Sequence, residues 1–351
     1  MRRSNHTSTL ERCKKFLSKT KNSFRGKYHL YTGEKLHWIE LVLRLESSII
    51  PVIFPWVLFC GIYGFLISLL YYFGFSITFS DKSAVLTNAV LSFNIGFTLL
   101  LVFRTNTAHA RFWEGRQLWG ALVNTVRNLT QGISVVVKEQ SAQERVEKEA
   151  ILRLIVAFSV SMKLHLRTEP LDEQLASLMS QTQYSMLKDT NHPTLQIAFW
   201  IRDYLQQQHD RNCLNIYQLT SLHGLLDNMI DILGGCERIL KTPLPLIYTI
   251  KLRELLLIFC LILPLEIVST LTWWTGLVIA FVSFTLLSIE QIGAEIEEPF
   301  GHDPNDLPLN AICNTMLQNV EELIKFAPNN TRSYSLARQQ STEVKPHSTR
   351  F

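Results

Sequence analysis

Long stretches of this sequence lack any charged side chain. No Asp, Glu, Lys or Arg occurs within residues 47–80, 83–103 or 267–289. A helix needs about 20 residues to cross the roughly 30 Å hydrocarbon core of a bilayer, and uncharged apolar runs of this length are typical of membrane spans. They argue against the two soluble domains that a length of 351 residues would otherwise suggest.

The sequence also lacks the short motifs of common catalytic sites. It contains no Gly-rich phosphate-binding loop, no HExxH pair and no GxSxG turn. The histidines of the polar middle and C-terminal part are scattered, which gives no ligand spacing for a metal. We therefore predict a protein that is not an enzyme and that needs no metal or cofactor.

Paired cysteines and a strong charge balance are missing as well. The six cysteines form no CxxC pair and fit no metal-ligand spacing; they are Cys13, Cys60, Cys213, Cys236, Cys260 and Cys313. The net charge is only +4, and the basic residues are concentrated in the first 44 residues and in the polar middle. This distribution is typical of the cytoplasmic flanks of a membrane protein and argues against nucleic acid as a partner.

The apolar runs predict four membrane helices. The first two cover about 49–73 and 84–103, the third begins near Pro245, and the fourth covers about 267–289. Charged residues in the first turns of the third helix, Arg253 among them, are expected near the interface or facing protein or water, because charge is costly at the bilayer centre.

The positive-inside rule gives the topology. The two outer turns, about 76–83 and 266–275, carry one lysine between them, whereas the termini and the middle carry nearly all other basic residues. Both termini and the middle are therefore predicted to be cytoplasmic. In the middle, Ser141 and Glu144 form a capping-box pattern before a long apolar run, which predicts a helix start there.

Together these features predict an all-α integral membrane protein in which a cytoplasmic helical bundle extends four transmembrane helices. The predicted parts are a basic, weakly ordered N-terminus (1–35), an amphipathic helix with the first two spans (36–104), a cytoplasmic helical region (105–241), the last two spans (242–291), a cytoplasmic turn and helix (292–326) and a disordered tail (327–351).

The second span carries the residues of greatest functional interest. Phe93 and Phe97 are four residues apart and share one face of a helix, and the span also contains Asn88, Asn94 and Thr98. The polar residues suit either contacts between helices or a water-filled pore. Taken alone, the Phe pair favours core packing over a hydrophobic constriction. Because four helices leave little room for a pore, a channel would need several copies of the chain.

Three separated segments resemble the bestrophin family, and most closely its prokaryotic and chloroplast branch. They are FRTNTAHARFWEGRQLWG (103–120), CERILKTPLPLIYT (236–249) and IEEPFGHDPNDLPL (296–309), and the likeness extends from about residue 30 to 325. The resemblance implies a homopentameric ion channel, mostly for anions. Its pore would be lined at a membrane neck by the second span, with another constriction deeper in the cytoplasmic region.

The family pattern assigns roles to particular residues. Phe93 and Phe97 correspond to neck residues that project into the pore, which reverses the preference for core packing. The third neck position falls on Ala89, where animal members have a bulky aliphatic residue. The cytoplasmic constriction falls near Thr220.

Animal members of the family bind calcium through an acidic cluster after the last span. The matching stretch here is GHDPNDL, in which Asp303 and Asp306 stand where ligand carboxylates would be. His302 and Pro304 replace acidic residues, which removes much of the charge that a hard cation needs. A solvated turn in which Asp caps the following helix is the reading that these residues favour.

The resemblance therefore implies passive conduction of chloride and other small monovalent anions, bicarbonate among them, in a plasma or thylakoid membrane. The expected partners are these anions, the lipid bilayer and further copies of the chain. The positive edges of the Phe rings would favour anions at the neck without a fixed charge. A monovalent-cation channel of the same fold and a non-conducting membrane scaffold or regulator are the alternatives.

Overall fold

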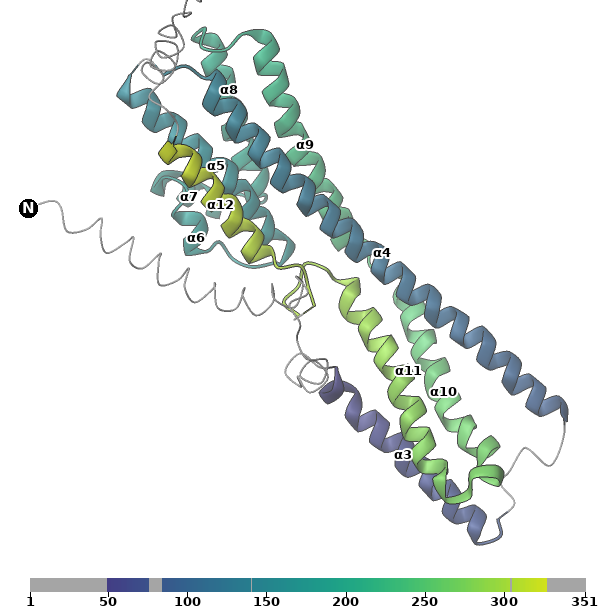
Figure 1. Cartoon of the computed structure of the whole chain (residues 1–351). Helices are drawn as coiled ribbons and strands as arrows, with labels where there is room; N and C mark the ends of the chain where they lie inside the picture. The colour runs from purple at the N-terminus through teal and green to yellow at the C-terminus, as the bar shows by residue number, and fades with distance from the viewer. Residues whose placement is uncertain (1–48, 76–83, 140, 304, 327–351) are drawn as a thin grey trace, which may run out of the picture. The chain divides into compact units, whose positions relative to one another are not determined.

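The computed structural model describes residues 49–75, 84–139, 141–303 and 305–326, and every regular element among them is a helix (Figure 1). This confirms the all-α class. The predicted N-terminal part (1–35), the amphipathic helix (36–46) and the tail (327–351) lie outside the described residues. The elements are α3 (Ile50–Tyr72), α4 (Ala84–Val136), α5 (Ala142–Leu166), α6 (Glu173–Ala176), α7 (Gln181–Lys188), α8 (Pro193–Asp210), α9 (Ile216–Lys241), α10 (Leu246–Leu271), the 3-10 turn η2 (Thr272–Trp274), α11 (Thr275–Glu297) and α12 (Leu309–Phe326).

The chain forms two compact units. Unit 1 contains the described residues up to 118 together with 236–311, and unit 2 contains 119–235 and the described residues from 312 onward. The helix α4 continues without a break through Arg104, so its first part belongs to unit 1 and its last part to unit 2.

Unit 1 is apolar on its surface as well as in its core. By length and composition, two helical stretches of the described residues could cross a membrane: 50–72, which is α3, and 246–297, which comprises α10, η2 and α11. The chain reverses direction at η2, and α10 and α11 therefore pack side by side (Figure 1). Large apolar side chains remain exposed on these helices, such as Phe54, Trp56, Leu277 and Phe281. A surface with so many exposed apolar side chains suits contact with lipid or with another protein chain.

Small residues bring α3 and α11 into close contact. A Cβ atom added to Gly276 would lie 3.0 Å from the carbonyl oxygen of Gly61 and 3.0 Å from the backbone nitrogen of Phe65. One added to Gly64 would lie 3.1 Å from the Cα atom of Gly276. Helices in membranes gain stability from such close backbone approach, because apolar side chains gain little by leaving lipid.

Substituting Gly276 with alanine is therefore expected to lower the melting temperature in detergent, because overpacking costs roughly 1–3 kcal/mol. Gly120→Ala is the matched control, since a Cβ atom there meets nothing within 4 Å. Alanine is favoured over glycine in a helix by about 0.5–1 kcal/mol, so this control should melt at the same or a higher temperature. Equal melting of the two variants would contradict the close packing of α3 on α11.

Unit 2 is built around α5, which is buried on almost all sides. From Ile151 to Leu166 nearly every side chain is buried, and α8 packs along this helix. The hydroxyl oxygen of Ser141 accepts a hydrogen bond from the backbone N–H of Glu144 (3.2 Å). This confirms that the capping pattern marks the start of the helix.

Candidate functional site

One face of α4 is buried within unit 1. Phe97, Leu101, Arg104 and Ala108 recur at intervals of four, three and four residues, which places them on one side of a helix. Their exposed fractions are 2%, 3%, 2% and 0%. This buried stripe contains an aromatic contact at Phe97 and, two turns further along the helix, a buried charge at Arg104.

The aromatic contact is a stack of three rings. The ring centroids of Phe93 and Phe97 lie 6.4 Å apart with an interplanar angle of 8°. Phe97 in turn stacks on Phe259 of α10, at 5.8 Å and 19°. Phe97 belongs to the apolar core of unit 1, which also contains Leu256 and Cys260, and Phe93 packs against this core while partly buried.

The structure thus brings Phe93 and Phe97 together on one face, as their spacing predicts. It places Phe97 in the packing position that the Phe pair favours when taken alone, and its role as a neck residue stays a prediction. Phe259 was missed by the sequence analysis, because it lies in a uniformly apolar segment in which no spacing distinguishes one phenylalanine from its neighbours.

The opposite face of α4 is exposed at the same level. Asn88, Ser92, Ile95, Gly96 and Leu99 all lie on this accessible surface. In this conformation, α4 therefore offers its surroundings small and polar groups alternating with aliphatic ones.

The other two polar residues named in the second span differ in their exposure. Asn94 is half-buried and Thr98 is exposed. The side chain of Ala89, the predicted third neck position, lies outside the described residues.

The predicted cytoplasmic constriction lies on α9 in unit 2. Thr220 is exposed, and its hydroxyl group donates to the backbone carbonyl of Ile216 (2.9 Å). One turn further along, burial and then the nearby Arg202 lower the pKa of His223, with a smaller opposite effect from Asp227. This shift favours the uncharged imidazole beside Thr220.

A buried ionic cluster lies further along the same face of α4. The guanidinium group of Arg104 is 3.7 Å from the carboxylate of Glu290 and 3.6 Å from that of Glu297, both on α11. It also donates to the hydroxyl oxygen of Thr249 on α10 (3.0 Å). Arg253 of α10 donates to Glu290 from its Nε atom (2.9 Å). Two carboxylates are thus held by arginines from two other helices.

Arg111 extends this cluster to the end of α9. Its guanidinium group donates to three backbone carbonyls, those of Ile239 (2.6 Å), Thr242 and Glu297 (3.3 Å). The Glu297 carboxylate also accepts from the backbone N–H of Leu244 (2.9 Å). Carbonyls at the end of α9 that have no partner within the helix are satisfied in this way.

The three segments that carry the family resemblance therefore meet at one place. Arg104 and Arg111 come from the first segment, Thr249 from the second and Glu297 from the third. A ring of Phe300, also from the third segment, lies against Gly115 of the first. The sequence analysis found the segments but not their contact. The feature of the sequence that indicated this contact was the presence of charged residues beside the apolar runs.

The acidic turn after α11 is folded back on itself. Asp306 is 4% exposed, and its carboxylate accepts from the backbone N–H of Asp303 (2.6 Å). The next helix begins only at Leu309. The expectation that an Asp here is solvated and caps that helix is therefore wrong for Asp306, which is buried and stabilises its own turn.

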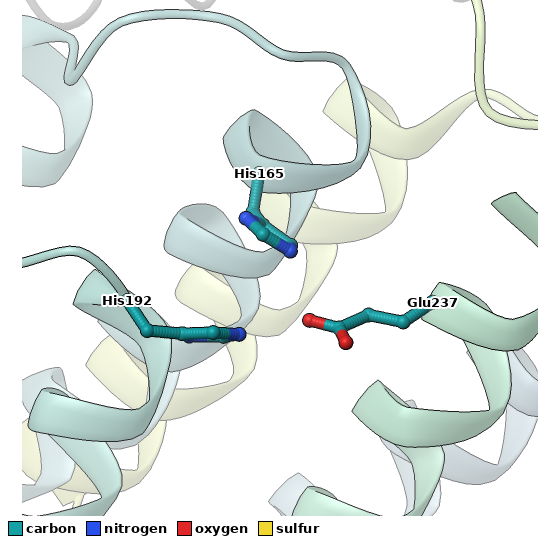
Figure 2. A group of neighbouring side chains, drawn as sticks. All are labelled: His165, His192 and Glu237. Carbon is teal, nitrogen blue, oxygen red and sulfur yellow. The ribbon is translucent and has the colours of Figure 1, made fainter. Parts of the chain in front are cut away.

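Two histidines of unit 2 that looked unrelated in the sequence lie together. The ring centroids of His165, near the end of α5, and His192, the N-cap residue of α8, are 4.6 Å apart (Figure 2). His192 accepts from the backbone N–H of Leu195 through Nδ1 (3.4 Å). Nδ1 of His192 therefore caps the first turn of α8.

Residues 31–322 match a family model described as Bacterial/Fungal Bestrophin protein. The chain is 50% identical over 313 residues to a voltage-dependent anion channel-forming protein of Nostoc, a match that covers 89% of this chain and 100% of the relative. It is 48% identical over 291 residues to a Synechocystis protein of the same description, covering 83% and 93%.

Solved structures show the same arrangement of the chain. A bacterial bestrophin homolog from Klebsiella pneumoniae superposes with a TM-score of 0.70 at 28% sequence identity. The superposition covers 78% of this chain and 98% of the homolog. The likeness therefore includes nearly the whole fold of that protein.

Proposed function

This chain belongs to the bestrophin family, and on that premise we propose that it is the subunit of a passive channel for chloride and other small monovalent anions. One observation carries the proposal. A relative that is 50% identical and is matched over its whole length bears the name of a voltage-dependent anion channel-forming protein. Bicarbonate, a monovalent anion of similar size, is included among the proposed permeant ions.

The proposed pore is formed by several copies of the chain, five by the family pattern, with α4 of each copy facing the axis. In this proposal the chain crosses the membrane four times and both termini are cytoplasmic. The apolar stretches 50–72 and 246–297 support the first, third and fourth spans. The exposed face of α4 carries the small and polar residues Asn88, Ser92 and Gly96 beside aliphatic ones. In this proposal the face borders the water-filled axis of the assembly.

The proposed neck has two arrangements that differ in the position of Phe97. With Phe97 stacked on Phe259, the accessible face at that level carries Ser92 and Gly96 together with Ile95 and Leu99, and the ring of Phe97 does not narrow the pore. A rotation that turns Phe93 and Phe97 to the axis would narrow it with apolar rings, and such a constriction closes a channel by dewetting. The burial of Phe97 in the single chain supports the first arrangement.

The test of this function is the reversal potential of the purified protein in a planar bilayer under a KCl gradient. We expect a potential close to the chloride equilibrium value. A potential near the potassium value would establish the cation channel instead. Ion flux that stays at the level of empty bilayers in the wild type and in every neck variant would favour a membrane scaffold that does not conduct.

A further inference from the structure

Unit 1 contains a partly open cavity of about 230 Å³ between α3, α10 and α11. Most of its lining is apolar and includes Val52, Trp56 and Leu287. Pockets that enclose a whole small-molecule ligand usually measure about 300–1,000 Å³. This cavity is smaller and open, which suits one part of a longer molecule.

The cavity lies at one level of the three helices. Arg253 is seven residues after the start of α10 at Leu246, and Glu290 is seven residues before the end of α11 at Glu297. Trp56 is in the second turn of α3. With a rise of 1.5 Å per residue, the cavity is about 10 Å inside the helix ends that we place on the cytoplasmic side. At this depth the phosphates of a leaflet and the beginnings of its acyl chains are both within reach of a long side chain.

The ionic cluster beside the cavity carries one more positive than negative charge, and Arg253 and Glu290 of this cluster line the cavity. The ionic cluster contains three arginines, Arg104, Arg111 and Arg253, and two glutamates, Glu290 and Glu297. Arg104 is buried, and Arg111 donates to three backbone carbonyls. Arg253 has a side chain that is 56% exposed and uses its Nε atom on Glu290. Within the described residues its two terminal nitrogens donate no hydrogen bond.

We propose that this cavity binds an anionic phospholipid of the cytoplasmic leaflet. An acyl chain lies along Val52, Trp56 and Leu287, and the phosphate accepts hydrogen bonds from the terminal nitrogens of Arg253. A planar guanidinium group is well matched to phosphate, and the lipid supplies the missing negative charge. The site depends on the membrane position proposed above but not on ion conduction.

Quenching of Trp56 by brominated lipids tests the site. The full chain is placed in phosphatidylcholine vesicles that contain increasing fractions of brominated phosphatidylglycerol or, in parallel, brominated phosphatidylcholine. The chain has seven tryptophans, so the signal of Trp56 is the difference between the wild type and Trp56→Phe. We expect half-maximal quenching at an about fivefold lower fraction of phosphatidylglycerol, which corresponds to about 1 kcal/mol for one basic residue at a lipid surface.

Variants of two basic residues of α10 distinguish binding in the cavity from a general effect of surface charge. Arg253→Gln should abolish the preference for phosphatidylglycerol, whereas Arg253→Lys should retain it. Lys251→Gln is the matched control, because Lys251 lies on the same helix, is 63% exposed, pairs with Glu254 and does not line the cavity. This control should bind as the wild type does.

Several outcomes would overturn the site. Equal quenching by both lipids in the wild type would remove its selectivity, and a loss of preference in Lys251→Gln would assign the effect to surface charge. Displacement of the brominated lipid by millimolar glycerol phosphate would point to free phosphate. No quenching of Trp56 by either lipid would mean that a second copy of the chain covers the cavity. Because the assay records binding alone, its failure leaves the channel proposal standing, and a channel that conducts cations leaves the lipid site standing.

Discussion

Substituting Phe97 with alanine is expected to raise chloride flux through the reconstituted protein by about tenfold, which corresponds to a barrier lower by about 1.4 kcal/mol. The physical reason is the loss of a large apolar ring from the neck in its narrow arrangement. Less dehydration is then required of an ion in transit, and water is retained in the constriction. Phe93→Ala should act in the same direction. Flux is measured as chloride efflux from liposomes per folded oligomer.

Substituting Phe259 separates the neck from the core. Phe259 stacks on Phe97 in unit 1 and belongs to α10, so Phe259→Ala leaves the side chains of the proposed neck unchanged. It removes the ring on which Phe97 stacks, which in the proposed channel frees Phe97 to turn toward the axis. Flux is therefore expected to fall. Phe281→Ala is the control, since Phe281 is 70% exposed on α11. Its flux should equal that of the wild type.

Truncating Phe97 also empties part of a packed core. A Phe→Ala change of this kind costs about 3–5 kcal/mol in soluble proteins, so the amount of folded oligomer is determined for each variant by size exclusion. Unchanged flux in folded Phe93→Ala and Phe97→Ala proteins would show that both rings serve packing alone. The same would follow if Phe259→Ala and Phe97→Ala changed flux in the same direction.

Substituting Arg104 with methionine is expected to destabilise the fold strongly. Arg104 is 2% exposed and lies between the carboxylates of Glu290 and Glu297. Removing one partner of a buried ion pair costs about 3–5 kcal/mol, because the remaining charge is left without compensation. The melting temperature in detergent should fall by many degrees, or the folded protein should be lost.

Two further variants make this prediction specific. Glu290 keeps Arg253 as a partner, so Glu297 is the carboxylate that loses its cation. Arg104→Met combined with Glu297→Gln removes this stranded charge and should recover part of the lost stability. Arg238→Gln breaks an ion pair with Glu114 in which the arginine is 67% exposed, and exposed pairs contribute about 0–1 kcal/mol. This control should melt close to the wild type. An Arg104→Met protein that melts like the wild type would contradict the importance of the buried cluster.

Local signals were sufficient to predict several elements. Proline at 245 marks the beginning of α10, and the charge-free run of 47–80 contains α3. The capping pattern at Ser141 marks the beginning of α5. Each depends on residues that are neighbours along the chain or belong to one continuous segment. Boundaries without such a signal were predicted less accurately. The predicted fourth span of 267–289, for example, includes η2, whereas α11 begins at Thr275.

By itself, the sequence determined that the chain is helical, that its apolar runs suit a membrane, and that Phe93 and Phe97 share a helix face. These properties follow from spacing and composition along a single segment. Only the tertiary structure decided that Phe97 stacks on Phe259 and that Arg104 lies between Glu290 and Glu297. Those partners come from helices far along the chain, and the periodicity of one helix specifies which face is buried but not which residue it meets.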